Sequence, residues 1–229
     1  MKGTVLITGA SGNLGGAVLN KFLDRGYRIA ALDTPRSASM ITETDRVKSF
    51  PVDLMDEQRV NEVVKEVYTA YGSIDMAVFT AGGFAMGNIV ETGTDTFEKM
   101  YRLNFITAYT IARQLFIRIA KQDGGQMVFI GSRPSLHPEQ AKNMIAYSLT
   151  KSLLFRLAEV INEDGSEVNV RASVIIPGII DTPQNRIAMP DADFTKWVSP
   201  TEIAENIYHL TTTAGRKLRE SIIKIYGDS

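Results

Sequence analysis

The start of the chain places a glycine-rich turn between a short strand and a helix, and this pattern restricts the fold more than any other. Residues 4–7 form the apolar, β-rich run expected of a strand buried on both faces of a parallel sheet. The glycine-rich turn 8–16 follows, and apolar residues then recur at helical spacing until Gly26. In such a turn, backbone N–H groups can approach a pyrophosphate, and the helix N-terminus favours its charge. The pattern therefore predicts a dinucleotide-binding turn.

The rest of the chain alternates further strands with helical patterns. Strands are expected at 27–32, 47–52, 74–79, 127–130, 169–176 and 221–226. Helical patterns run over 94–121, 144–162 and 201–210, and a one-sided apolar stripe extends from Val60 to Tyr71. This alternation predicts an α/β protein: a single-domain Rossmann-type doubly wound parallel sheet of about seven strands, with helices on both faces, over residues 1–229. The long connection 184–200 predicts a substrate loop at about 178–200.

Composition excludes several classes of function. Lys and Arg number 25 against 26 Asp and Glu, so no basic surplus indicates nucleic acid or an anionic membrane. With no cysteine and only His137 and His209, neither a thiolate nor a histidine-rich metal site is expected. No signal-peptide pattern is visible, and no apolar run approaches the ~20 residues that span a bilayer. We therefore expect a cytoplasmic protein that acts on a small molecule.

Acidic residues end the second and third predicted strands. Asp33 lies about 20 residues beyond the glycine turn, where a carboxylate can bond the hydroxyls of an adenosine ribose. It is also a good first residue for the turn 33–35, and both roles can hold at once. Arg36 raises the possibility of a 2′-phosphate, but the glycine loop holds no basic residue, so NAD(H) is favoured and NADP(H) remains possible. Asp53 either contacts the adenine amino group or caps the next helix.

Three further positions could carry chemistry. Small residues follow the fourth strand at Thr80-Ala81-Gly82, where they form either a tight turn or a surface for a cofactor. Asn104 lies within an apolar helical face, so it is either a satisfied core residue or a functional one. Ser132 ends the fifth strand at the sheet edge where ligands bind in open α/β folds. Its alternative role is local bonding to the backbone.

Tyr147 and Lys151 lie four residues apart on a predicted helix, so their side chains share one face. An ammonium beside a phenol favours the phenolate and lowers the phenol pKa from about 10. We therefore expect Lys151 to lower the pKa of Tyr147 toward the range of a general acid or base. Chance spacing is the competing interpretation of a pair this short.

Taken in order, these signals resemble the short-chain dehydrogenase/reductase family over essentially the whole chain. The glycine turn has the TGxxGxxG form, with Asn13 where many members carry glycine, and Thr80 replaces the asparagine of an Asn-Ala-Gly segment. Ser132 and the Tyr147/Lys151 pair match the catalytic serine and YxxxK, and Asn104 falls at the fourth catalytic position. The resemblance implies that the following residues bind cofactor: Gly9, Ser11, Gly12, Asn13, Leu14, Gly15, Asp33, Asp53, Ala81, Gly82, Pro177, Gly178 and Thr182.

A narrower resemblance links residues 81–84, 181–186 and 189–197 to the dihydropteridine reductase branch of this family. That branch uses NADH to reduce a quinonoid dihydropterin. The resemblance implies that Phe84, Met189 and Trp197 contact substrate. Animal members of the branch carry tryptophan at the position of Phe84 and lack the serine that this chain keeps as Ser132.

The resemblance also implies a mechanism in which Tyr147 exchanges a proton with the substrate oxygen, Ser132 orients that oxygen and Lys151 bonds the nicotinamide ribose. Asn104 would hold a water that joins Lys151 to solvent. We therefore expect an NAD(P)(H)-dependent oxidoreductase that acts on a small carbonyl or alcohol. Quinonoid dihydropteridine reduction is the first alternative. The second is a non-catalytic nucleotide-sensing protein, which the complete set of catalytic residues disfavours.

Family members commonly pair through the helices that carry Asn104 and Tyr147. These helices have apolar residues on more than one side, including Tyr109, Phe116, Leu154 and Phe155. We expect a homodimer or homotetramer, although the second apolar face could also be covered within one chain.

Overall fold

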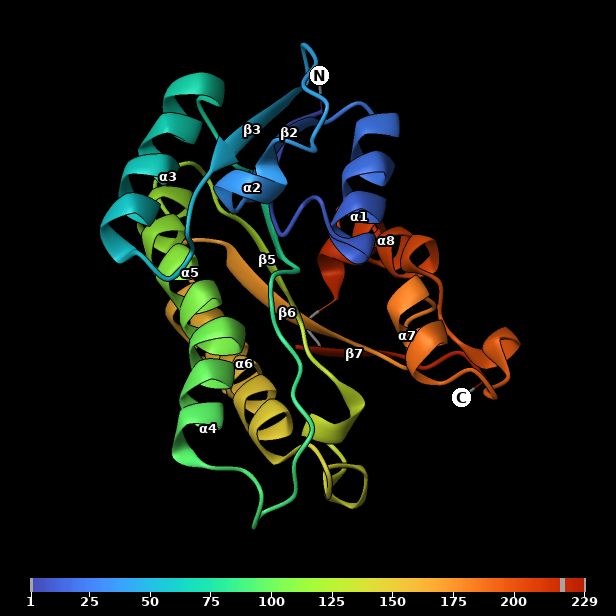
Figure 1. The fold of residues 1–229 in the computed structure, drawn as a ribbon. Coiled ribbons are helices and arrows are strands. Elements are labelled where there is room, and N and C mark those ends of the chain that lie inside the picture. The colour runs from blue at the N-terminus through green and yellow to red at the C-terminus, as the bar shows by residue number, and fades with distance from the viewer. Residues whose placement is uncertain (1, 219–220, 229) are drawn as a thin grey trace.

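The computed structural model describes residues 2–218 and 221–228, and a parallel sheet forms its centre (Figure 1). The strands are β1 (Thr4–Thr8), β2 (Arg28–Asp33), β3 (Val47–Pro51), β4 (Met76–Phe79), β5 (Gly125–Ile130), β6 (Val170–Pro177) and β7 (Ile222–Ile225). Their order in the sheet is β3-β2-β1-β4-β5-β6-β7, and each neighbouring pair is parallel. The predicted seven-stranded doubly wound fold is confirmed.

Helices cover both faces of the sheet (Figure 1). One face carries α3 (Glu57–Tyr71), α5 (Thr107–Ile119) and α6 (Ile145–Asp164), with α4 (Thr94–Tyr101) beside α6. The other face carries α1 (Asn13–Asp24) and α8 (Pro200–His209), which pack against each other. Two short helices, α2 (Pro35–Ala38) and α7 (Pro183–Ala188), lie at the carboxyl edge of the sheet, after β2 and β6. Each face of the sheet therefore contributes its own hydrophobic core.

The central strands β1 and β4 are buried along their whole length because both of their faces are covered. All five residues of β1 are buried, and their side chains alternate between the two cores. The core under α3 contains the predicted stripe from Val60 to Tyr71, while the core under α1 contains Phe22. Packing of this kind fixes the strand ends, so the carboxyl edge of the sheet is a rigid platform for the loops that follow it.

The predicted helix over 94–121 is interrupted by a π-helical turn, Arg102–Ile106. The turn separates α4 from α5 and includes Asn104, whose side chain is buried. A π-turn adds a residue to the helix and changes the direction in which following side chains point. The apolar periodicity on either side hides this interruption in the sequence.

The connection 184–200 is also more ordered than expected, because it contains α7 and a 3₁₀ turn, Phe194–Lys196. Thr182 caps α7 by accepting a hydrogen bond from the Asn185 backbone N–H at 3.2 Å. Pro183 occupies the first helical position, where its missing N–H costs nothing. A parallel bridge between Ile180 and Val198 joins the two ends of the segment. We call residues 178–200 the substrate segment below.

None of the helices in the described part of the chain combines the length and apolar character needed to cross a bilayer.

Two adjacent glycines of α1 allow a test of how tightly the glycine turn packs. A Cβ at Gly15 would lie only 2.1 Å from the Gly9 carbonyl oxygen, whereas a Cβ at Gly16 would lie 3.7 Å from the Ala10 oxygen. We predict that Gly15→Ala lowers the free energy of unfolding by about 1–3 kcal/mol, since overpacking shifts the backbone. The control Gly16→Ala should raise it by about 0.5–1 kcal/mol, because alanine favours helix. Urea unfolding measures both, and equal effects would contradict the predicted packing.

Candidate active site

A cavity of about 320 Å³ opens where the carboxyl ends of β1, β2, β3 and β4 meet, a size within the range of small-molecule sites. It lies at the reversal of strand order between β1 and β4, where open α/β sheets bind ligands. The lining residues are Gly9, Ser11, Gly12, Asp33, Thr34, Asp53, Leu54, Met55, Thr80, Ala81, Gly82, Leu103 and Thr107. Asp33 therefore lines the same cavity as six other predicted cofactor residues.

Reciprocal hydrogen bonds join the ends of β1 and β4. The Thr80 hydroxyl donates to the Thr8 carbonyl oxygen at 2.6 Å, and the Ala81 N–H donates to the Thr8 hydroxyl at 3.3 Å. Thr80 stands where the family pattern has asparagine, so its shorter side chain supplies a bond between the two loops. The two loops predicted to touch the cofactor are thus held in fixed positions.

The backbone around the cavity fits a dinucleotide. Gly9 has φ +64°, a conformation that favours glycine. A Cβ at Gly82 would lie 2.8 Å from the Asn104 Oδ1 and 3.3 Å from the Lys151 Nζ, so only glycine leaves this corner open. Gly12 precedes α1, whose N-terminus favours an anionic group. The residues present therefore suit a nicotinamide dinucleotide along the carboxyl edge of the sheet.

Asp33 ends β2 and is 9% exposed. Its Oδ2 accepts hydrogen bonds from the Ser11 N–H at 2.9 Å and the Ser11 hydroxyl at 2.6 Å, and its Oδ1 accepts one from the Thr34 N–H at 2.9 Å. A carboxylate has about four acceptor sites, so one remains for a ligand hydroxyl. Asp33 therefore serves the turn and faces the cavity at the same time.

Asp53 follows β3 and also lines the cavity, and its Oδ1 accepts the Met55 N–H at 3.0 Å. The two apolar residues after it, Leu54 and Met55, form part of the wall and were absent from the prediction. Their position directly after an acidic strand end is the signal that could have indicated them.

Tyr147 and Lys151 share one face of α6, as their spacing predicts. Lys151 is 6% exposed, and its Nζ donates to the Ile130 carbonyl oxygen at 2.8 Å. That carbonyl ends β5, two residues before Ser132. The helix and the strand therefore bring Ser132, Tyr147 and Lys151 to one part of the sheet edge.

The expected lowering of the Tyr147 pKa is wrong in direction. Desolvation raises the pKa of the Tyr147 phenol, and a hydrogen bond with Ser132 lowers it by a smaller amount. Burial also lowers the pKa of Lys151 to about 8. The spacing correctly predicted that the two side chains share a helix face. It carried no information on desolvation, which disfavours both charged forms.

Asn104 bridges two parts of the site. Its Oδ1 accepts the Gly83 N–H at 2.8 Å, and its Nδ2 donates to the Thr150 hydroxyl at 3.2 Å. Thr150 in turn donates to the Ala146 carbonyl oxygen at 2.7 Å, so the buried amide is satisfied. The side chain thus ties the loop after β4 to α6. Thr150 was not predicted, although it lies directly before Lys151.

Ser132 is buried at the end of β5, and its Oγ lies 2.6 Å from the Oγ of Ser135. Ser135 closes the 3₁₀ turn Arg133–Ser135, and its N–H donates to the Ser132 carbonyl oxygen at 3.1 Å. The serine was therefore placed correctly, while its hydroxyl neighbour was missed.

The predicted substrate residues differ in their surroundings. Phe84 is 59% exposed, and its ring meets the Tyr147 ring edge-on with centroids 5.0 Å apart. Met189 follows α7 and is half-buried. Trp197 is buried, and its ring packs on the Phe194 ring with centroids 4.7 Å apart. Phe84 is thus next to the candidate catalytic group, whereas Trp197 packs within the substrate segment.

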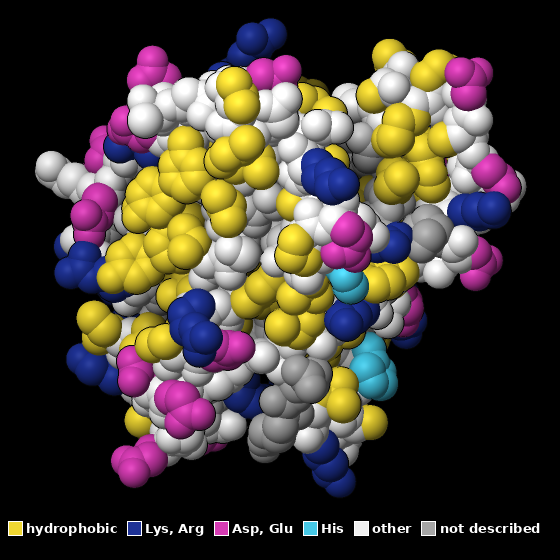
Figure 2. Space-filling model, turned by 90° about the horizontal axis from the view of Figure 1, so that it is seen from below, with side chains coloured by type: hydrophobic (Ala, Val, Ile, Leu, Met, Phe, Trp, Pro, Cys, Tyr) yellow, Lys and Arg dark blue, Asp and Glu magenta, His cyan; other side chains and the backbone are white. Residues whose placement is uncertain are grey.

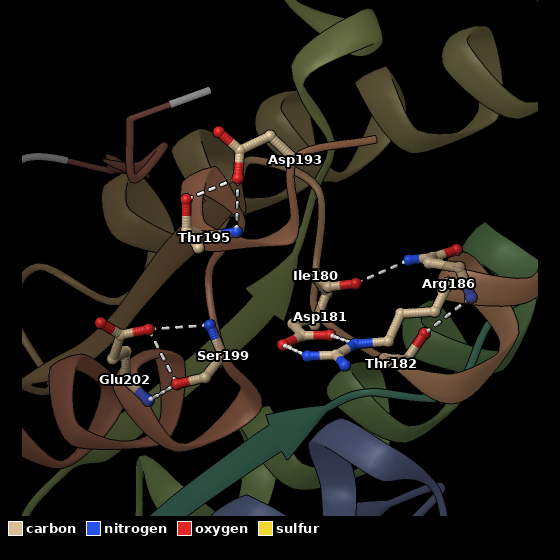
Figure 3. Close-up of polar contacts among 9 residues, drawn as sticks. Ile180, Asp181, Thr182, Arg186, Asp193, Thr195, Ser199 and Glu202 are labelled. Carbon is tan, nitrogen blue, oxygen red and sulfur yellow. Dashed lines mark hydrogen bonds and ion pairs between the residues drawn. The ribbon is translucent and has the colours of Figure 1, made fainter. Parts of the chain in front are cut away.

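Polar contacts hold the substrate segment in shape (Figure 3). Arg186 makes a paired hydrogen bond with the Asp181 carboxylate at 2.6 and 2.7 Å. Ser199 and Glu202 form a capping box at the start of α8. Outside the figure, the Gly178 N–H donates to the Ile225 carbonyl oxygen at 2.8 Å.

One hydrogen bond crosses from the glycine turn to the substrate segment. The Asn13 side-chain amide donates to the Gln184 side-chain oxygen at 2.9 Å. Asn13 begins α1 and Gln184 lies in the first turn of α7. Thr182, which caps α7, therefore belongs to a segment that lies beside the glycine turn, and Pro177 ends β6 directly before that segment.

Comparison with known proteins agrees with this geometry. The pattern of the short chain dehydrogenase family matches residues 3–192. A dihydropteridine reductase of Dictyostelium discoideum is 27% identical, covering 98% of this chain and 94% of that protein. A 2-(R)-hydroxypropyl-CoM dehydrogenase of Xanthobacter autotrophicus is 29% identical, with coverage of 83% and 80%.

Solved structures share the fold. ElxO with NADP bound has a TM-score of 0.90 at 24% identity, covering 99% of this chain and 98% of that one. A short-chain type dehydrogenase/reductase from Mycobacterium ulcerans has a TM-score of 0.91 at 20% identity, with coverage of 100% and 90%. The chain belongs to the short-chain dehydrogenase family and is an oxidoreductase of that family.

The low pKa of Lys151 makes stability depend on pH. Its pKa is about 8 in the folded protein against 10.5 when unfolded, so the folded state binds fewer protons between these values. Below pH 8 the folded protein carries the full cost of a buried ammonium, and this cost falls as pH rises toward 10.5. We predict that, relative to Lys151→Met, the wild type gains free energy of unfolding between pH 7 and pH 9.5.

Urea unfolding at both pH values measures this gain. The control Lys99→Met removes an exposed lysine of α4 and should leave the pH dependence unchanged. A constant difference between wild type and Lys151→Met across this range would show that Lys151 is charged and well solvated.

Proposed function

We propose that this protein transfers a hydride between a nicotinamide cofactor and a small carbonyl or alcohol substrate, with Tyr147 as the proton donor or acceptor. The observation that carries the proposal is the grouping of Ser132, Tyr147 and Lys151 at the sheet edge, with the Lys151 amine beside Gly82 of the cofactor cavity. A structural ion pair would not require a half-buried phenol and a buried amine on one face of a helix. A cofactor-positioned reaction does require them.

The proton chemistry follows from the desolvated phenol. Because the pKa of Tyr147 is raised, the phenol is protonated at neutral pH and can act as a general acid during reduction. Ser132 can donate a hydrogen bond to the same substrate oxygen as it gains negative charge. A nicotinamide cofactor would supply the hydride at the adjacent carbon when it is bound. In the reverse direction Tyr147 accepts the proton from the alcohol.

Lys151 and Asn104 support this arrangement. Lys151 uses one donor on the Ile130 carbonyl oxygen, and its remaining donors can hold ribose hydroxyls beside Gly82. Asn104 fixes the Gly83 N–H and, through Thr150, the helix turn that carries Lys151. Asn104 therefore positions both the lysine and the loop that would lie against the nicotinamide ribose.

Removing the Tyr147 hydroxyl tests the proposal. We predict that Tyr147→Phe lowers turnover by about 10²–10⁴-fold, the usual contribution of a positioned acid or base, while NADH affinity is unchanged. A panel of aldehydes, ketones and a quinonoid dihydropterin, followed by NADH absorbance, gives the wild-type rate. Tyr109→Phe, on the exposed side of α5, is the matched control and should keep full activity.

If Tyr147→Phe turns over substrate within a few-fold of the wild-type rate, Tyr147 is not the proton donor or acceptor. If the wild type binds NADH and reduces no member of the panel, a nucleotide-sensing role gains support. If only the dihydropterin is reduced, the likeness to the Dictyostelium discoideum reductase extends to its substrate.

We further propose that the cofactor is NADH rather than NADPH. The Asp33 carboxylate faces the cavity and keeps one acceptor site for a ribose hydroxyl, but it would repel a 2′-phosphate. Arg36 is the nearby cation and is exposed on α2. ElxO, although similar in fold, was solved with NADP bound, so the choice must rest on these side chains.

Two variants, each of which removes one negative charge, test this preference for NADH. We predict that Asp33→Ala narrows the affinity gap between NADH and NADPH by at least tenfold, since one lost charge contact is worth about 1.4 kcal/mol or more. Asp53→Ala, which removes the carboxylate on the adenine side, should change both affinities alike. Fluorescence titration measures the dissociation constants. Tighter binding of NADPH by the unaltered protein would show that Arg36 dominates.

We also propose that two copies associate through α5 and α6. Leu154 and Phe155 are buried within one chain, so they no longer support this expectation. Exposed apolar side chains on the outer helices do support it, and Figure 2 shows hydrophobic side chains gathered on the side that carries α4, α5 and α6. The exposed large apolar residues of α4, α5 and α6 are Phe97, Tyr109, Ile117, Leu149, Leu153 and Val160. Tyr109 continues an aromatic stack formed with Phe105 and Tyr101.

Light scattering should give a multiple of the 25.3 kDa chain mass at micromolar concentration. We predict that Leu153→Arg on α6 shifts the mass toward one chain, because a charge would be buried in the interface. Ile187→Arg, at an equally apolar but 81% exposed position on α7, should leave the mass unchanged. A single-chain mass for the wild type would overturn the proposed association.

A further inference from the structure

Ser135 is a second serine next to the candidate catalytic serine, and the backbone fixes its position. The 3₁₀ turn Arg133–Ser135 starts directly after Ser132, and the Ser135 N–H donates to the Ser132 carbonyl oxygen at 3.1 Å. This turn brings the two hydroxyl oxygens within 2.6 Å of each other. At that separation one of the hydroxyls donates its proton to the other.

The direction of that hydrogen bond decides what Ser132 can do. A serine hydroxyl has one proton and two acceptor lone pairs. If Ser132 gave its proton to Ser135, that proton would point away from Tyr147 and from a substrate oxygen held beside it. If Ser135 donates instead, Ser132 keeps its proton for the substrate. A hydroxyl that accepts one hydrogen bond also becomes a stronger donor.

We propose that Ser135 is a positioning residue that donates its hydroxyl proton to Ser132 and so directs the Ser132 hydroxyl at the substrate oxygen. The inference rests on the proposed function, since Ser132 needs a free proton only if it stabilises a substrate oxygen. The two serines would then form a chain of hydrogen bonds. Ser135 donates to Ser132, and Ser132 donates to the substrate oxygen on which negative charge develops. Ser135 does not itself touch the reacting atoms.

A double-mutant cycle on the best carbonyl substrate tests this role. Ser132→Ala should lower kcat by about 10²–10³-fold, as loss of an oxyanion donor does. Ser135→Ala should lower kcat by about tenfold, the usual size of one neutral hydrogen bond, with the NADH dissociation constant unchanged. The double variant should be no slower than Ser132→Ala alone, because Ser135 acts through Ser132. Ser135→Thr, which keeps the hydroxyl, should recover most of the rate.

Ser152→Ala is the matched control, since the Ser152 hydroxyl of α6 donates to an exposed backbone acceptor, the Leu149 carbonyl oxygen. It should leave kcat unchanged. A Ser135→Ala enzyme with full kcat would overturn the proposal. So would a double variant whose loss equals the product of the two single losses, since that would indicate a separate structural role.

The wild-type rate keeps this proposal separate from the proposed function. If the wild type reduces no carbonyl compound, the function fails, and crystal structures of the wild type and Ser135→Ala then test the hydroxyl pair alone. We expect the Ser132 side chain to leave its rotamer when the Ser135 hydroxyl is absent. An unchanged Ser132 rotamer would overturn the positioning role.

Discussion

The site depends on how two strands that are distant in sequence are joined at their carboxyl ends. β1 and β4 are neighbours in the sheet, and Thr8 and Thr80 exchange hydrogen bonds with each other's loops directly beyond the paired residues. The Thr80 hydroxyl oxygen also lies 3.4 Å from the Gly9 carbonyl oxygen, as a weaker second contact. These bonds fix the spacing between the glycine turn and the loop 81–83, which is the form of preorganisation that dinucleotide binding uses.

The second constraint is the burial of polar groups that the chemistry needs. A buried amine without partners would cost several kcal/mol, and the strand-end carbonyl of Ile130 supplies one partner for Lys151. The buried amide of Asn104 also needs partners, and the Gly83 N–H and the Thr150 hydroxyl provide them. The π-turn that contains Asn104 is the backbone distortion that accompanies this arrangement, and π-turns are frequent at functional sites. Polar satisfaction and catalytic positioning thus depend on the same contacts.

The sequence predicted the sheet well because buried parallel strands are continuous apolar runs, and glycine or acidic residues mark their ends. It also predicted that Tyr147 and Lys151 share a helix face, since this depends on local periodicity alone. The direction of the Tyr147 pKa could not be predicted, because desolvation arises from residues distant in sequence. The π-turn was hidden by the apolar pattern that continues through it. Helix α7 could have been found, since Thr182 and Pro183 form a standard helix start.

The partners of individual hydroxyl groups lay further beyond prediction. Ser135 is three residues from Ser132, but only the 3₁₀ turn brings the two hydroxyls together. Ser11 binds Asp33 across 22 residues, through two strands whose register must be known first. The residue types were therefore visible in the sequence, while their pairing followed from the tertiary fold.

The central claim is direct hydride transfer at this sheet edge, and an isotope experiment tests it most directly. NADH carrying deuterium at the reactive nicotinamide carbon would be incubated with the protein and its best carbonyl substrate. Mass spectrometry then locates the label in the product. Direct transfer places deuterium on the new carbinol carbon from one of the two stereospecifically labelled cofactors. A reduced product that carries no label from either cofactor, or bound NADH with no product from any carbonyl compound, would contradict it.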